Sequence, residues 1–111
     1  MIDERDLIAM IERLESQALR HWIELGWIRP EPGGAGFTFD DADVARVHLI
    51  CDLCYDLDVS EETMPIVLSL IDQLHVTRRT LRAFATVIDE QPADVRDRIA
   101  ERLRAMLCRE Q

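Results

Sequence analysis

The chain has 111 residues, of which 48% are hydrophobic, 32% are charged and 5% are aromatic, and its formal net charge is −9. This length and apolar content suit one modest core, and the low aromatic content favours helices over a sheet-rich sandwich. No apolar run approaches the roughly 18 residues of a membrane span, and the acidic N-terminal residues argue against a secretory signal. We therefore expect a soluble, mainly α-helical, cytoplasmic protein.

The charge is distributed unevenly along the chain. Residues 1–75 hold 5 arginines against 16 acidic residues, a balance of −11, whereas residues 76–111 hold 8 arginines against 6, a balance of +2. A strongly negative surface repels the phosphates that nucleic-acid-binding proteins attract with basic residues. DNA is therefore an unfavourable partner for the first two thirds of the chain.

Two short helices are expected at the start of the chain. Apolar residues recur at helical spacing over residues 3–14, behind acidic residues that suit the positive end of a helix dipole. Ser16 follows a tight turn and is expected to cap a second helix, which ends at Gly26, a common C-terminal stop.

A small β-hairpin is expected next. Residues 27–30 and 36–39 are short alternating apolar stretches on either side of a segment rich in turn-forming residues. Asp40 or Asp41 then caps a helix that runs to about Leu57. We expect its buried stripe to contain Val44, Val47, Cys51, Cys54 and Leu57.

A long helix of about 25 residues is expected between the start at residues 60–64 and the breaker Gln91-Pro92. At about 1.5 Å rise per residue it would extend near 37 Å, which is more than so small a domain covers with its own helices. Its seam at steps of three and four is either intramolecular core or, as we favour, a homodimer interface. The predicted dimer residues are Val67, Leu70, Leu74, Leu81, Phe84 and Ile88.

Pro92 is expected to open a C-terminal helix over residues 92–109, which folds back on the long helix or on a partner subunit. The chain then divides into residues 1–58, which resemble a helix-turn-helix with a wing, and residues 59–111, which hold the last two helices. We expect both parts to belong to one compact domain.

The segment Ala18-Leu19-Arg20-His21-Trp22-Ile23-Glu24-Leu25-Gly26-Trp27-Ile28-Arg29-Pro30 resembles the second helix and following turn of MerR-type regulators. The resemblance implies a winged helix-turn-helix fold, with residues 27–39 as the wing. MerR-type wings carry an arginine that meets phosphate, and here Thr38 occupies that place. Arg20 and His21 lie where these regulators touch the DNA backbone. The nearest acids in sequence, Glu15, Glu24 and Glu31, are expected to offset them, and we expect Arg20 to form a structural ion pair instead.

Within that superfamily, Phe39-Asp40-Asp41, the acidic helix after it and Met64-Pro65-Ile66-Val67-Leu68-Ser69-Leu70-Ile71-Asp72 resemble CbpM, the chaperone-modulatory proteins. The resemblance covers about residues 5–85. It implies a protein that binds the J-domain of a CbpA- or DnaJ-type co-chaperone and inhibits the co-chaperone by competing with Hsp70. J-domains carry a basic helix, so an acidic modulator suits them electrostatically.

The predicted partner-binding surface is an acidic group near the end of the third helix, joined by an aromatic residue at the start of the hairpin. Exposed tryptophan is a common interface anchor, and the acidic group is alternatively only a solvated helix face. The predicted residues are Asp52, Asp56, Asp58, Glu61, Glu62 and Trp27.

No catalytic constellation is present, because no nucleophile has a paired base and no glycine loop is built to cradle phosphate. We therefore expect no enzyme and no cofactor. The chain has three cysteines, and an odd number in a chain without a secretory signal argues against a disulfide framework. His48, Cys51 and Cys54 have a spacing that could suit a metal, but buried core residues explain them better. The alternative function is a MerR-type DNA-binding transcriptional regulator. A redox or zinc sensor that acts through Cys51 and Cys54 is the third possibility.

Overall fold

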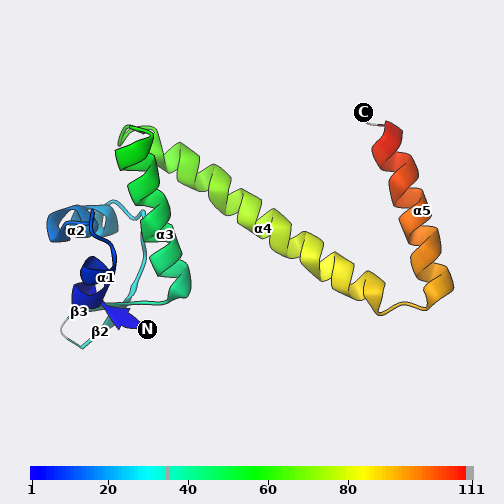
Figure 1. Cartoon of the computed structure of the whole chain (residues 1–111), viewed down its shortest axis with the longest axis horizontal. Coiled ribbons are helices and arrows are strands. Elements are labelled where there is room, and N and C mark those ends of the chain that lie inside the picture. The colour runs from blue at the N-terminus through cyan, green and yellow to red at the C-terminus, as the bar shows by residue number, and fades with distance from the viewer. Residues whose placement is uncertain (35, 110–111) are drawn as a thin grey trace. The chain divides into compact units, whose positions relative to one another are not determined.

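The computed structural model describes residues 1–34 and 36–109 and divides into two compact units, Met1–Leu68 and Ser69–Gln111. The protein is mainly helical and has one small antiparallel sheet of three strands (Figure 1). In chain order the elements are β1 (Ile2–Asp3), α1 (Glu4–Met10), α2 (Ser16–Glu24), β2 (Glu31–Gly33), β3 (Gly36–Phe39), α3 (Asp41–Cys51), the π-helix η1 (Asp52–Asp56), α4 (Met64–Asp89) and α5 (Ala93–Arg109). Among the described residues, no helix is long and apolar enough to cross a membrane.

The first unit gathers α1, α2, α3 and the sheet around one core (Figure 1). Side chains from every part of this unit are removed from water, and this burial supplies most of the favourable free energy of folding. The largest fully buried side chains are Phe39, Leu7, Leu19, Ile28, Ile50, Met64, Val47 and Cys51. Met64 and Leu68 are both buried, so the first unit extends ten residues beyond the predicted division at residue 58.

The helix termini follow local chemistry. The Asp40 side chain accepts from the backbone N–H of Asp43, and the Asp43 side chain accepts from the backbone N–H of Asp40. The two hydrogen bonds form a capping box at the start of α3. Gly26 adopts a φ of +81°, as expected for a residue that stops a helix. The prediction of Ser16 as a cap is wrong, because its hydroxyl donates to Glu4 instead, and α1 ends at Met10 rather than at residue 14.

The sheet differs from the expected hairpin in two respects. The order is β1-β3-β2, so the N-terminal Ile2 pairs with Phe39 and adds a third strand. Residues 27–30 do not form the first strand of the hairpin, which is β2. The backbone of Trp27 is engaged elsewhere, because its N–H donates to the carbonyl of Trp22 and its own carbonyl accepts from Arg46.

The end of the third helix also differs from the prediction. After Cys51 the hydrogen bonds change to π-helical spacing, and the Leu57 N–H donates to the Asp52 carbonyl at 3.1 Å. The wider turn shifts the phase of the helix, so Leu57 leaves the buried stripe and is 67% exposed. The prediction of Leu57 as a core residue is therefore wrong.

Candidate functional site

Arg13 joins two of the predicted partner-binding carboxylates. Its Nη1 lies 2.7 Å from Oδ1 of Asp56 and its Nη2 lies 2.8 Å from Oδ1 of Asp52. Hydrogen bonds first to Asp56 and then to Asp52 raise the pKa of Arg13 above its ordinary value. The guanidinium carbon also lies 5.7 Å from the centre of the Tyr55 ring, within the range of a cation–π contact. The π-helix places all three partners on one side of η1.

Glu61 belongs to the same acidic group and has a different partner. Its Oε1 lies 3.0 Å from Nε2 of His21 on α2, with both side chains more than half exposed. The side chains of Asp58 and Glu62 make no hydrogen bond or ion pair with any other residue that the structure describes. The five predicted acids therefore divide into two that are held by Arg13, one that is held by His21 and two that are open to a partner.

Tyr55 is the surface residue that sequence reasoning missed. Its ring is 42% exposed and lies 6.2 Å from the ring of Trp22, which is itself stacked on Trp27 at 6.4 Å. Burial is the main cause that raises the pKa of the Tyr55 hydroxyl, so the ring stays neutral at physiological pH. The available signal was an aromatic residue that lies next to the predicted apolar stripe and between acidic residues.

Trp27 is 6% exposed, so the expectation that it is a half-exposed anchor is wrong. Its ring packs on Trp22 inside the first unit. Burying a large aromatic side chain stabilises the folded chain more than leaving it in water at the end of a strand would. Tyr55 is the exposed end of this aromatic group. The exposed ring of this aromatic group therefore lies on η1, next to the acids.

The three residues with metal-like spacing do not converge. Cys51 is fully buried and Cys54 is half-buried, whereas His48 is exposed. Burial raises the pKa of both thiols, which favours the neutral thiol over the thiolate that binds zinc. Among the residues that the structure describes, no group of three or more histidine, cysteine or acidic side chains is placed to hold a metal ion.

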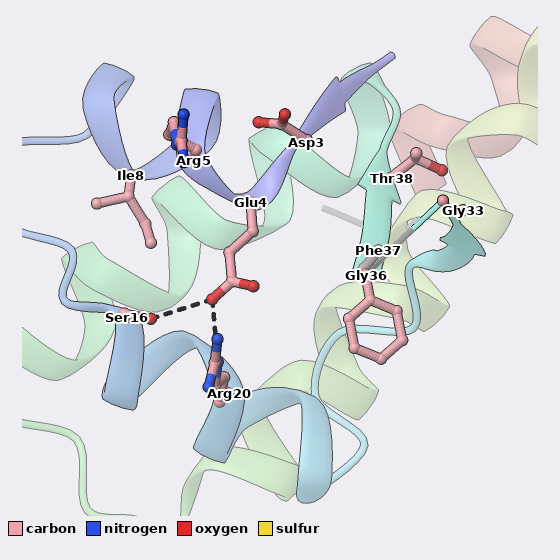
Figure 2. Close-up of a pocket in the computed structure, with 11 residues that line it drawn as sticks. Asp3, Glu4, Arg5, Ile8, Ser16, Arg20, Gly33, Gly36, Phe37 and Thr38 are labelled. Carbon is pink, nitrogen blue, oxygen red and sulfur yellow. Dashed lines mark hydrogen bonds and ion pairs between the residues drawn. The ribbon is translucent and has the colours of Figure 1, made fainter.

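A cavity of about 790 Å³ lies between α1, α2 and the hairpin (Figure 2). In Figure 2, Oε1 of Glu4 accepts from the Ser16 hydroxyl at 3.1 Å and from Nε of Arg20 at 3.2 Å. Arg20 therefore forms the expected ion pair, but its partner is Glu4 rather than Glu15, Glu24 or Glu31. Two arginines, Arg5 and Arg20, and two acids, Asp3 and Glu4, line the cavity, so its charged side chains carry no net positive charge and it is a weak site for phosphate.

The hairpin side of the cavity is shaped by close backbone packing. Gly33 pairs with Gly36, and a Cβ added at Gly33 would lie 2.8 Å from the methyl carbon of Thr38. The Thr38 hydroxyl donates to the carbonyl of Glu31 at 3.3 Å, so this side chain serves the hairpin itself. Thr38, which occupies the position of the arginine in MerR-type wings, thus bonds within the hairpin.

The predicted dimer residues lie along α4 and differ in exposure. Leu70, Leu74, Leu81 and Phe84 are between 47% and 62% exposed, whereas Val67 and Ile88 are half-buried. Only Met64 and Leu68 of the helix are buried, and both belong to the first unit. The chain itself leaves this apolar face in contact with solvent.

Comparisons of the chain with protein-family models, with curated proteins and with solved structures found no match.

Proposed function

We propose that the protein binds the J-domain of a CbpA- or DnaJ-type co-chaperone and inhibits the co-chaperone by occluding the surface that Hsp70 uses. The observation that carries this proposal is the charge of the first unit, where residues 1–68 hold 5 arginines and 15 acidic residues, a net charge of −10. Such a surface accelerates association with a basic partner and repels acidic ones. The protein acts by binding alone, without catalysis.

The geometry at η1 supports a cationic partner. Arg13 already occupies this surface from within the chain, with its guanidinium between two carboxylates and near an aromatic ring. The same combination of carboxylates and an exposed Tyr55 suits the arginine and lysine side chains of a basic helix. Asp58 and Glu62, which lie in the segment between η1 and α4, add uncompensated negative charge, and side chains of this kind set the association rate.

The proposed scaffold is a winged helix-turn-helix that has lost its DNA-binding chemistry. The order of α1, α2, hairpin and α3, with β3 central in the sheet, supports this interpretation. Thr38 bonds within the hairpin and Arg20 bonds to Glu4, so neither supplies an uncompensated cation for phosphate. The three free cysteines are in keeping with the reducing cytoplasm in which the complex would form.

Isothermal titration calorimetry against a purified J-domain, at low and at physiological salt, tests the proposal. Asp58→Asn with Glu62→Gln removes two open charges, and asparagine tolerates the φ of +52° at position 58. This variant is expected to bind roughly 10-fold more weakly at low salt. The matched control, Asp89→Asn with Glu90→Gln, removes the same charge from the second unit and is expected to bind normally.

Two results would contradict the proposal. Absence of detectable heat at high micromolar concentration excludes the J-domain as the partner, and equal losses in both double variants exclude the acidic surface as the contact. Binding of duplex DNA at moderate salt, together with no binding to the J-domain, would instead support a transcriptional regulator.

A further inference from the structure

A cation already occupies part of the acidic group. The guanidinium of Arg13 bridges two carboxylates of η1, with Nη1 2.7 Å from Oδ1 of Asp56 and Nη2 2.8 Å from Oδ1 of Asp52. Its central carbon lies 5.7 Å from the centre of the Tyr55 ring. A guanidinium is planar and carries its donors in a fixed fork, so one group can bond two acids and face a ring. The surface is therefore an occupied arginine site and not a bare group of acids.

Arg13 reaches this site from a distant segment of the chain. It lies between α1 and α2, 39 residues from Asp52 and 43 residues from Asp56. Ile11 and Leu14, on either side of Arg13, are each 4% exposed, so the core holds this segment in place. Because an arginine side chain has several rotatable bonds, Arg13 can leave the acids while its backbone stays anchored.

The contact is weak enough to be exchanged. All three charged side chains are in contact with water, since Arg13 is 42%, Asp52 57% and Asp56 59% exposed. Exposed ion pairs contribute little to stability, because water and salt screen the charges and the paired side chains lose rotamer freedom. An arginine from another protein can therefore replace Arg13 without unfolding the first unit.

The geometry suits a guanidinium better than an ammonium group. Two nitrogens of one planar group each bond to a different carboxylate, and the same group lies near the half-exposed ring of Tyr55. Arginine stacks on aromatic rings and is more weakly hydrated than lysine, whose ammonium is a compact point charge. An arginine side chain of a partner therefore fits this site better than a lysine side chain.

We propose that Arg13 is a built-in occupant of a site for an arginine side chain of the basic partner, and that the partner binds by displacing Arg13 from Asp52 and Asp56. The identity of that partner rests on the proposed function, whereas the site itself does not. The ion pairs of Arg13 must break before those of the partner form. Arg13 therefore holds the affinity for the partner below the value that the bare acids would give.

NMR titration of the full chain with N-acetylarginine amide tests the site without a protein partner. Arg13→Gln removes the built-in guanidinium, and the probe is expected to shift resonances of residues 52–56 in this variant. The wild-type protein is expected to bind the probe roughly 10-fold more weakly, because Arg13 competes with it. N-acetyllysine amide is expected to bind Arg13→Gln more weakly than the arginine probe does.

Two further variants serve as controls. Arg20→Gln removes an exposed arginine that pairs with Glu4 in the same unit, and it is expected to bind the probe as the wild type does. Asp52→Asn with Asp56→Asn, added to Arg13→Gln, is expected to abolish binding of the probe. The substituted side chains are between 42% and 69% exposed, so the first unit is expected to stay folded, which fluorescence of the buried tryptophans verifies. Equal affinities of the wild type and Arg13→Gln, or binding that survives the loss of both acids, would overturn the site.

A second measurement follows Arg13 itself in the complex with a purified J-domain. The side-chain signals of Arg13 in the isotope-labelled wild-type protein are identified by their absence from the spectrum of Arg13→Gln. On saturation with the J-domain they are expected to move to the positions of a solvated arginine. Signals that stay in place although the J-domain binds would overturn the exchange and leave the proposed function intact. A J-domain that does not bind would contradict the proposed function, and the probe titration would still decide whether the arginine site exists.

Discussion

Leu68 and Leu70 are two residues apart on α4 and differ sharply in exposure. Leu68 is 3% exposed in the first unit, whereas Leu70 is 59% exposed in the second. Leucine and alanine have similar helix propensities, so replacing either by alanine changes the helix itself very little. The pair therefore separates the contribution of burial from that of helix formation.

The expected magnitudes follow from this burial. Leu68→Ala removes a buried side chain and leaves a cavity, which costs about 2–5 kcal/mol of unfolding free energy. Leu70→Ala removes a side chain that is mostly in contact with water, and its cost to the first unit is expected below about 1 kcal/mol. The midpoint of thermal unfolding should fall by about 10 °C or more for Leu68→Ala.

Urea unfolding followed by tryptophan fluorescence measures these values. Both tryptophans, Trp22 and Trp27, are buried in the first unit, so their emission reports this unit alone. The measurement is made at a concentration low enough to disfavour the predicted homodimer. Equal losses for the two variants, or a loss below about 1 kcal/mol for Leu68→Ala, would refute the assignment of the start of α4 to the first core.

Three further predictions concern the surface, the hairpin and the thiols. Arg13→Gln is expected to raise the affinity for a J-domain at low salt, because it frees the two carboxylates that Arg13 holds; unchanged affinity in calorimetry would show that they do not contact the partner. Gly33→Ala is expected to cost about 1 kcal/mol or more in urea unfolding, since its Cβ would meet a threonine methyl group, whereas Gly36→Ala meets nothing within 4 Å and should cost less; the reverse order would contradict the packing. At pH 8 a disulfide reagent is expected to modify Cys108 rapidly and Cys51 only after unfolding, because Cys51 is buried and its raised pKa lowers the thiolate fraction; rapid reaction of all three thiols would contradict this burial.

Local sequence patterns predicted the helices well, because their signals depend on neighbouring residues. The capping chemistry at Asp40, the stop at Gly26 and the opening of the last helix after Pro92 all act over one turn. The long unbroken run after Met64 predicted α4, which has 26 residues. The negative charge of the first part of the chain is likewise a property of the sequence alone.

Contacts between distant residues could not be read from such patterns. Arg13 meets carboxylates 39 and 43 residues away, and Ile2 pairs with Phe39 to add a strand that no local signal marks. These contacts exist only because burial of the first core brings the segments together. The same packing buries Trp27 although it begins a short alternating stretch typical of a strand.

The candidate partner-binding surface depends both on local sequence and on contacts between distant residues. The sequence by itself determined which acids are available, but the π-helical turn at Asp52–Asp56 decided that Leu57 faces solvent. Only the tertiary structure decided that Arg13 and His21 bond to three of the five acids and that Tyr55 stays exposed beside Asp52 and Asp56. The physical reason is that charge is counted along the chain, whereas ion pairing and exposure depend on which segments the core holds side by side.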